Sequence, residues 1–168
     1  MESGLQNVFE AAKDLWQGRR LPVSADLDLA VAALSATDPI KRIAGSAILL
    51  ISKSNRVAIG EIAEVLKELS LLVSQIPTEH HFWLTSTIVM LPEEILLRDD
   101  CLRRFIYMAV FSQSSSSRCN ATLMLDRLAK KGDRVSRKLL QIAVMDEDSN
   151  VASNARSSLE GLENDKAE

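Results

Sequence analysis

Apolar residues recur along most of this chain of 168 residues at the spacing of an α-helix. The clearest stripe begins at Val151 and continues with Ala155, Leu159 and Leu162. Residues at these intervals share one face of a helix with about 3.6 residues per turn. The acidic run over 146–148 offers side-chain oxygens for an N-cap and complements the positive end of the helix dipole. We therefore predict a helix over 148–162.

The same spacing predicts eight further helices, separated by short polar turns. Gly18 ends the first helix, and Pro77 and Pro92 end two others, because proline biases the residue before it toward extended conformations. Thr37 or Asp38 can cap a helix whose first residue is Pro39. The full set of predicted helices covers residues 5–17, 25–36, 38–53, 57–75, 78–91, 94–112, 116–131, 134–145 and 148–162. We expect the polar tail over 163–168 to fray.

Polar residues at several other helix starts suit the N-cap position. Ser24 and Thr78 precede the apolar stripes of the helices over 25–36 and 78–91. Asp99 or Asp100 caps the stripe within 94–112, and a short turn over 93–98 precedes it. In the helix over 134–145, the stripe predicted to face the core consists of Val135, Leu139, Ile142 and Ala143.

Three of the predicted helices share one pattern of apolar and polar positions. When Ile40 is aligned with Val151, Ala44 falls on Ala155, and the polar junctions before the two helices match as well. A third copy begins at Ser117, which departs from the apolar pattern at its first position. The third copy precedes the Val151 stripe by a period of about 34 residues, which is typical of helical-hairpin repeats. In such repeats, neighbouring pairs bury each other's apolar faces.

In these segments the chain resembles the HEAT-repeat family of stacked helix pairs. The resemblance rests on Leu34 through Ile51, Ser117 through Leu128 and Ile142 through Leu162, and it extends by pairing over about 140 residues. It implies an all-α, right-handed α-solenoid of about four stacked antiparallel pairs plus the N-terminal helix, in a single domain over 1–168. A closed helical bundle is the alternative. The four pairs are 25–36 with 38–53, 57–75 with 78–91, 94–112 with 116–131, and 134–145 with 148–162.

Composition is that of an ordinary globular protein, with 46% hydrophobic and 26% charged residues. Two cysteines, Cys101 and Cys119, indicate neither a disulfide framework nor a four-cysteine zinc site, so a reducing compartment fits best. There is no secretory signal pattern and no apolar run near the roughly 18 residues that a membrane span needs. We expect a soluble, cytoplasmic protein without membrane contact.

Charge is segregated, although the net charge is only −3. Residues 1–97 carry a net charge of −4, residues 98–138 carry +6, and residues 139–168 carry −5. A solvated helical surface can produce such blocks, and lysines at a helix C-terminus also complement its dipole. The alternative is a partner-binding surface in the basic segment 118–138. Its candidate residues are Arg127, Lys130, Lys131, Arg134, Arg137 and Lys138.

No motif for catalysis, a cofactor or a metal is evident. There is no phosphate-binding glycine pattern, nucleophile elbow or Cys-x-x-Cys pair. His80 and His81 are adjacent, so they point about 100° apart on a helix and are poorly placed to share a metal. Acidic pairs at 93–94 and 99–100 are expected near helix starts. Most aromatic residues lie on or beside apolar stripes, and Trp83 has the least certain direction.

These observations predict a non-catalytic module or scaffold that binds a protein partner, without a cofactor or metal. The resemblance also implies an alternative, nucleic-acid binding through the basic segment, because some HEAT-like proteins bind DNA through a basic face. In the last helix we expect Asn154 and Ser158 to face solvent and to cover the end of the array.

Overall fold

The computed structural model describes residues 7–164, which form ten α-helices and two short 3-10 helices and contain no strand. The predicted all-α class is therefore confirmed. The chain divides into two compact units, Met1–Leu91 and Pro92–Glu168, and each is described by itself. The single repeat domain over 1–168 stays a prediction. Residues 5–6 of the first predicted helix and residues 165–168 of the predicted tail lie outside the described residues.

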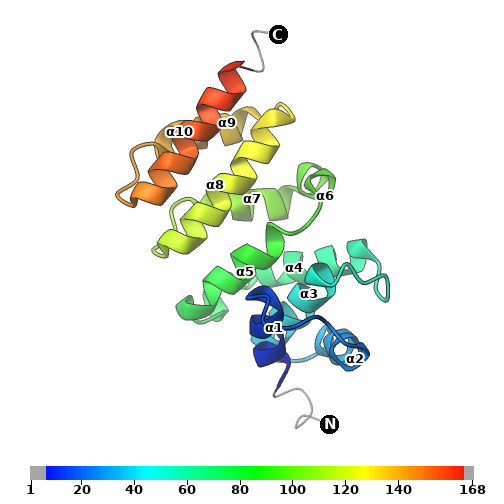
Figure 1. Cartoon of the computed structure of the whole chain (residues 1–168). Helices are drawn as coiled ribbons and strands as arrows, with labels where there is room; N and C mark the ends of the chain where they lie inside the picture. The colour runs from blue at the N-terminus through cyan, green and yellow to red at the C-terminus, as the bar shows by residue number, and fades with distance from the viewer. Residues whose placement is uncertain (1–6, 165–168) are drawn as a thin grey trace. The chain divides into compact units, whose positions relative to one another are not determined.

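In the first unit, α3 (Pro39–Ile51) is the central helix and packs against four other helices. Every residue from Ile43 to Leu49 is buried, so this helix is packed on more than one side. The helices around it in Figure 1 are α1 (Val8–Trp16), α2 (Ser24–Ala33), α4 (Ile59–Leu71) and α5 (His81–Ile88). Two 3-10 helices, η2 (Val73–Gln75) and η3 (Thr78–His80), connect α4 to α5.

An aromatic cluster joins α1 to α5. Trp83 packs edge-on against Phe9 and Trp16, with ring centroids 5.3 and 5.9 Å apart. Such edge-to-face pairs are favoured by the charge distribution of aromatic rings. The half-buried Trp83 therefore contributes to packing, as the other aromatic residues of this cluster do.

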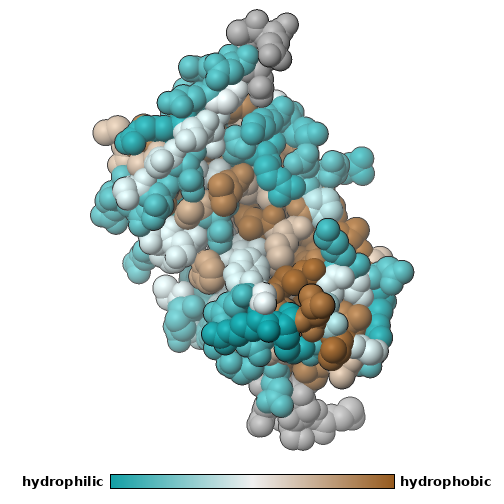
Figure 2. Space-filling model, in the orientation of Figure 1, coloured by the Kyte–Doolittle hydropathy of each residue, from teal (hydrophilic) through white to brown (hydrophobic). Residues whose placement is uncertain are grey.

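Figure 2 shows exposed hydrophobic atoms over the α1–α2 connection, which contains the exposed Leu21 and Val23.

In the second unit, one helix pair repeats another. The first pair consists of α7 (Asp100–Ala109) and α8 (Ser115–Lys130), and the short α6 (Glu93–Arg98) precedes it. The second pair consists of α9 (Arg134–Ala143) and α10 (Ser149–Asn164), and all four of its bounds lie at one constant offset from their counterparts. Figure 1 shows α8 and α10 side by side, and these two helices are in extensive contact.

The buried positions of these pairs repeat at the same offset. In α8 and α10, Ala121 corresponds to Ala155, and Leu128 corresponds to Leu162; all four are buried. The predicted alignment of these two helices is thus reproduced in the buried side chains. Small alanines at the matched positions let neighbouring helices approach closely.

Several N-caps agree with the sequence. The carboxylate of Asp38 accepts a hydrogen bond from the Ile40 amide, and that of Asp99 accepts one from the Leu102 amide. The predicted caps Ser24 and Thr78 are wrong. Ser24 is the first residue of α2, and Asp26 accepts from the preceding Val23 amide instead; Thr78 begins η3 and its side chain makes no capping bond.

Several helix bounds differ from the predictions; α2, for example, ends at Ala33 and α7 ends at Ala109. The predicted short turn over 93–98 is the helix α6, after which the Asp99 cap starts α7, whereas the predicted helix 57–75 ends as an α-helix at Leu71. The segment 78–91 begins with a 3-10 turn before α5. Residues 163–164 belong to α10, so fraying does not begin at 163.

Asn154 does not face solvent as predicted. It is half-buried, and its side-chain amide donates to the Cys119 sulfur at 3.1 Å, which links α10 to α8. Ser158 is also half-buried. Across the described residues, no helix combines the length and the apolar character that crossing a bilayer requires.

Candidate protein-binding surface

The helix α9 turns a different stripe inward from the predicted one. Its buried residues are Ser136, Leu140 and Ala143, whereas Val135 is 47% exposed and Ile142 is 53% exposed. The predicted core positions at 135 and 142 are therefore wrong. Asp133 explains the difference, because its carboxylate accepts from both the amide and the hydroxyl of Ser136. A serine whose hydroxyl is bonded in this way can occupy a buried position.

The helix α7 presents matching apolar residues to solvent. Met108 is 67% exposed and Phe111, just beyond the helix, is 58% exposed. Their counterparts in the second pair are Ile142 and Met145, the second of which is 85% exposed. Isolated exposed apolar side chains are ordinary, but two matched pairs at equivalent places form a repeated feature of the surface.

Contacts at two places hold α7 beside α9. The Tyr107 hydroxyl donates to Asp133 at 2.7 Å, and Asp133 is the N-cap of α9. At the other end, residues 110–113 and the turn residues Asp146 and Glu147 line one shallow cavity of about 550 Å³. The outward sides of the two helices therefore form one candidate surface.

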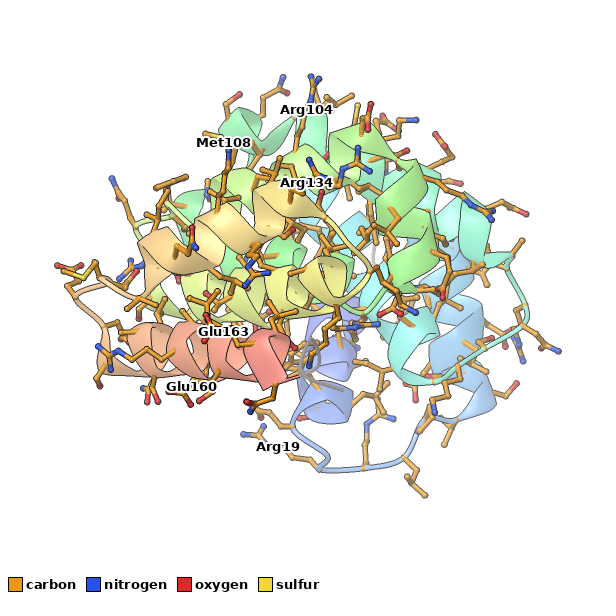
Figure 3. The ribbon with its side chains drawn as sticks, turned by 90° about the horizontal axis from the view of Figure 1, so that it is seen from above. Arg19, Arg104, Met108, Arg134, Glu160 and Glu163 are labelled. Carbon is orange, nitrogen blue, oxygen red and sulfur yellow. The ribbon has the colours of Figure 1, made fainter. Side chains whose placement is uncertain are left out.

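We name this surface the α7–α9 face. Figure 3 shows Arg104, Met108 and Arg134 on the side of unit 2 that faces away from Glu160 of α10. Arg104, Arg134 and Lys138 are exposed, and among the described residues none of the three makes a hydrogen bond or ion pair through its side chain. The α7–α9 face consists of Arg104, Met108, Phe111, Arg134, Val135, Lys138, Ile142 and Met145.

Three of the six predicted basic residues form ion pairs with acidic residues. Arg127 and Lys131 both bind Glu93, at 3.2 and 3.1 Å. The hydrogen bond from Lys131, followed by the effects of Arg127, outweighs desolvation and lowers the pKa of Glu93. Lys130 binds Asp126 at 2.8 Å within α8. These three cations already have acidic partners in the second unit.

The other three predicted residues lie on α9. Arg134 and Lys138 belong to the α7–α9 face, whereas the half-buried Arg137 lies on a neighbouring side of the helix. Arg134, Arg137 and Lys130 also line a cavity of about 440 Å³ beside Gly132 and Leu162. The α9 N-terminus next to this cavity is capped by Asp133, so part of its capacity to bind an anion is already used.

The environment of the Tyr107–Asp133 hydrogen bond shifts the pKa values of both side chains. Burial, together with the hydrogen bond to Asp133 and its negative charge, raises the pKa of Tyr107 to about 12. Burial opposes ionisation of Asp133, but hydrogen bonds from Ser136 and Tyr107 outweigh it and keep the pKa of that carboxyl below its usual range. The pair therefore stays a neutral donor and a charged acceptor over the physiological range.

We expect the tyrosine absorbance of the folded chain to titrate near pH 12. Tyr107 is the single tyrosine, so the near-ultraviolet absorbance of tyrosinate reports on this residue alone. In urea the midpoint should return to about 10. Because the folded pKa is the higher one, the stabilising contribution is complete below about pH 10 and is lost as the pH rises toward 12. The variant Asp133→Asn should lower the folded midpoint; an unchanged midpoint would contradict the assigned bond.

The two adjacent histidines make separate structural contacts. The Nε2 atom of His81 lies 2.8 Å from the Ile76 carbonyl oxygen and so fastens the α4–α5 connection. The His80 ring packs edge-on against Phe9. Within residues 7–164, no cluster of three or more histidine, cysteine, aspartate or glutamate residues could hold a metal ion. No protein-family model, curated protein or solved structure matches this chain.

Sequence reasoning missed most of the α7–α9 face. Arg104, Met108 and Phe111 lie outside the predicted basic set, and the predicted core includes Ile142. A signal is nevertheless present, because aligning residues 100–111 with 134–145 places Arg104 on Lys138 and Met108 on Ile142. Only the exposure of the aligned residues distinguishes a repeated surface from a repeated core.

Proposed function

We propose that this chain is a non-catalytic HEAT-like module that binds a protein partner through the α7–α9 face. The exposed pairs Met108 with Ile142 and Phe111 with Met145 carry the proposal. Protein interfaces concentrate their binding energy in apolar and aromatic side chains that become buried, with charged residues around them. The two methionines, the phenylalanine and the three cations without a partner among the described residues match that composition. The repeated helix pair of the second unit supports the solenoid architecture.

Nucleic-acid binding through 118–138 has weaker support. Arg118 is buried and bound to Asp146, while Arg127, Lys130 and Lys131 have acidic partners. A surface for duplex DNA needs cations available to several phosphates, and its affinity then falls steeply with added salt. The apolar side chains of the α7–α9 face would contribute little binding energy on contact with a charged phosphate backbone. We therefore favour a protein partner.

Site-specific cross-linking tests this proposal. A photoreactive phenylalanine analogue at position 108 should form a covalent adduct with a defined partner in an extract of the native cell. The same analogue at position 123 is the control, because Leu123 is 51% exposed but lies on α8 outside the face. An adduct specific to position 108 is the expected result. Adducts at neither position, or equal adducts at both, would contradict it.

A further inference from the structure

We infer that the partner segment on the α7–α9 face is an acidic amphipathic helix; this inference rests on the proposed function. The first reason is the local charge. Arg104, Arg134 and Lys138 are three exposed cations that have no acidic partner among the described residues. Of the nearby carboxylates, Asp100 is bound to Arg103, and Asp133 is half-buried as the N-cap of α9. The face therefore offers three available positive charges, and charge complementarity favours acidic residues on its partner.

The second reason is the position of the apolar residues relative to the cations. Met108 on α7 and Phe111 just beyond this helix follow Arg104 by four and seven residues. On α9, Ile142 and Met145 follow Lys138 by the same intervals. Seven residues of helix span about 10 Å. Both rows therefore have a cation at one end and two apolar side chains at the other.

A helix lying along these rows can match both of them. It has the same rise per residue, so its carboxylates and apolar anchors must also be about four and seven residues apart. Its apolar face would rest on Met108 and Ile142 while its acidic end meets Arg104 and Lys138. An extended strand rises about 3.3 Å per residue and would bring every second side chain to the face at a different spacing.

Selection from a phage-displayed library of random 16-residue peptides against the full chain tests the inference. We expect enriched peptides to carry aspartate or glutamate four and seven residues from leucine, isoleucine, phenylalanine or methionine. The variant Arg104→Glu/Lys138→Glu should weaken their binding at least tenfold, and added salt should weaken it as well. The control Lys53→Glu/Arg98→Glu has the same charge change at exposed residues of other elements and should bind normally.

The outcomes separate this inference from the proposed function. Suppose that peptide binding depends on Phe111 and Ile142, but that the peptides lack acidic residues or bind the charge-reversed variant equally well. This result would contradict an acidic partner and would still support a protein-binding face. Peptides that depend on neither pair, or no enrichment, would count against both. Binding of the face to anionic phospholipid vesicles in place of peptides, or self-association through it, would likewise overturn an acidic peptide partner.

Discussion

The substitution Asp146→Ala is expected to lower the free energy of unfolding by about 3 kcal/mol, because the buried Arg118 guanidinium loses its buried carboxylate partner and keeps the exposed Glu147, at 3.5 Å, as its acidic partner. Both side chains are about nine-tenths buried. Two bonds of 2.8 and 3.0 Å join the guanidinium to the Asp146 carboxylate, and a third of 2.9 Å reaches the Ser112 carbonyl oxygen. Arg118 thereby fastens the α7–α8 turn to the α9–α10 turn.

A double-mutant cycle measures this coupling. Arg118→Met should cost a similar amount, since it leaves the Asp146 carboxylate buried. The double variant Arg118→Met/Asp146→Leu should be much less destabilised than the sum of the single variants, because an apolar pair removes both buried charges. Urea unfolding at neutral pH provides the three free energies. Simple additivity would show that the two side chains do not act as a pair.

The same pair predicts a pH dependence. The hydrogen bonds from Arg118 outweigh desolvation and hold the pKa of Asp146 below its usual range. The stabilising contribution is therefore complete above the unfolded pKa of about 3.9 and disappears as the pH falls through the lower folded value. The difference in stability between the wild type and Asp146→Asn should be constant from about pH 6 to 8 and shrink below about pH 4.

The second large effect is expected at Gly45, in the middle of α3. A Cβ atom at this position would lie 2.7 Å from the Ala30 carbonyl oxygen and 2.9 Å from the Ala33 Cβ, both on α2. The carbonyl belongs to the helix backbone, so α2 as a whole would have to move. Gly45→Ala should therefore destabilise the chain by about 3 kcal/mol, although alanine is intrinsically about 1 kcal/mol better than glycine in a helix.

Gly161→Ala is the matched control, because a Cβ at this position of α10 meets no atom within 4 Å. There the helix preference acts alone, and the variant should be more stable by about 0.5–1 kcal/mol. Thermal or urea unfolding of the two variants should thus give shifts of opposite sign. A neutral or stabilising Gly45→Ala would contradict the close approach of α2 and α3.

Helix positions were predictable because each helix has its own apolar periodicity, which needs no information from the rest of the chain. Asp38 and Asp99 were recognisable as caps for the same local reason. The inward face of α9 was not predictable in this way. Val135 and Ile142 are more apolar than Ser136, yet the Asp133 bonds and the packing of α9 against α8 and α10 turn Ser136 inward.

The surface and the ion pairs depend on tertiary neighbours. Arg118 lies in α8 and Asp146 lies in the α9–α10 connection, and nothing local indicates that they meet. Likewise, charge counting groups Arg127 and Lys131 with Arg134, but the fold brings Glu93 to the first two only. The candidate site therefore became visible when exposure and ion pairing were added to the repeat that the sequence already contains.

The most direct test of a protein-binding α7–α9 face begins with a partner that cross-linking has identified. The affinity of this partner is then measured for a variant in the face and for a variant at an equally exposed apolar residue of α8. Phe111→Ser/Ile142→Ser should weaken binding at least tenfold, which corresponds to about 1.4 kcal/mol, and should leave the circular dichroism spectrum unchanged. Leu123→Ser, at a side chain of similar exposure on α8, should bind as the wild type does. Unchanged affinity in the double variant, or an equal loss in Leu123→Ser, would contradict a binding site on this face.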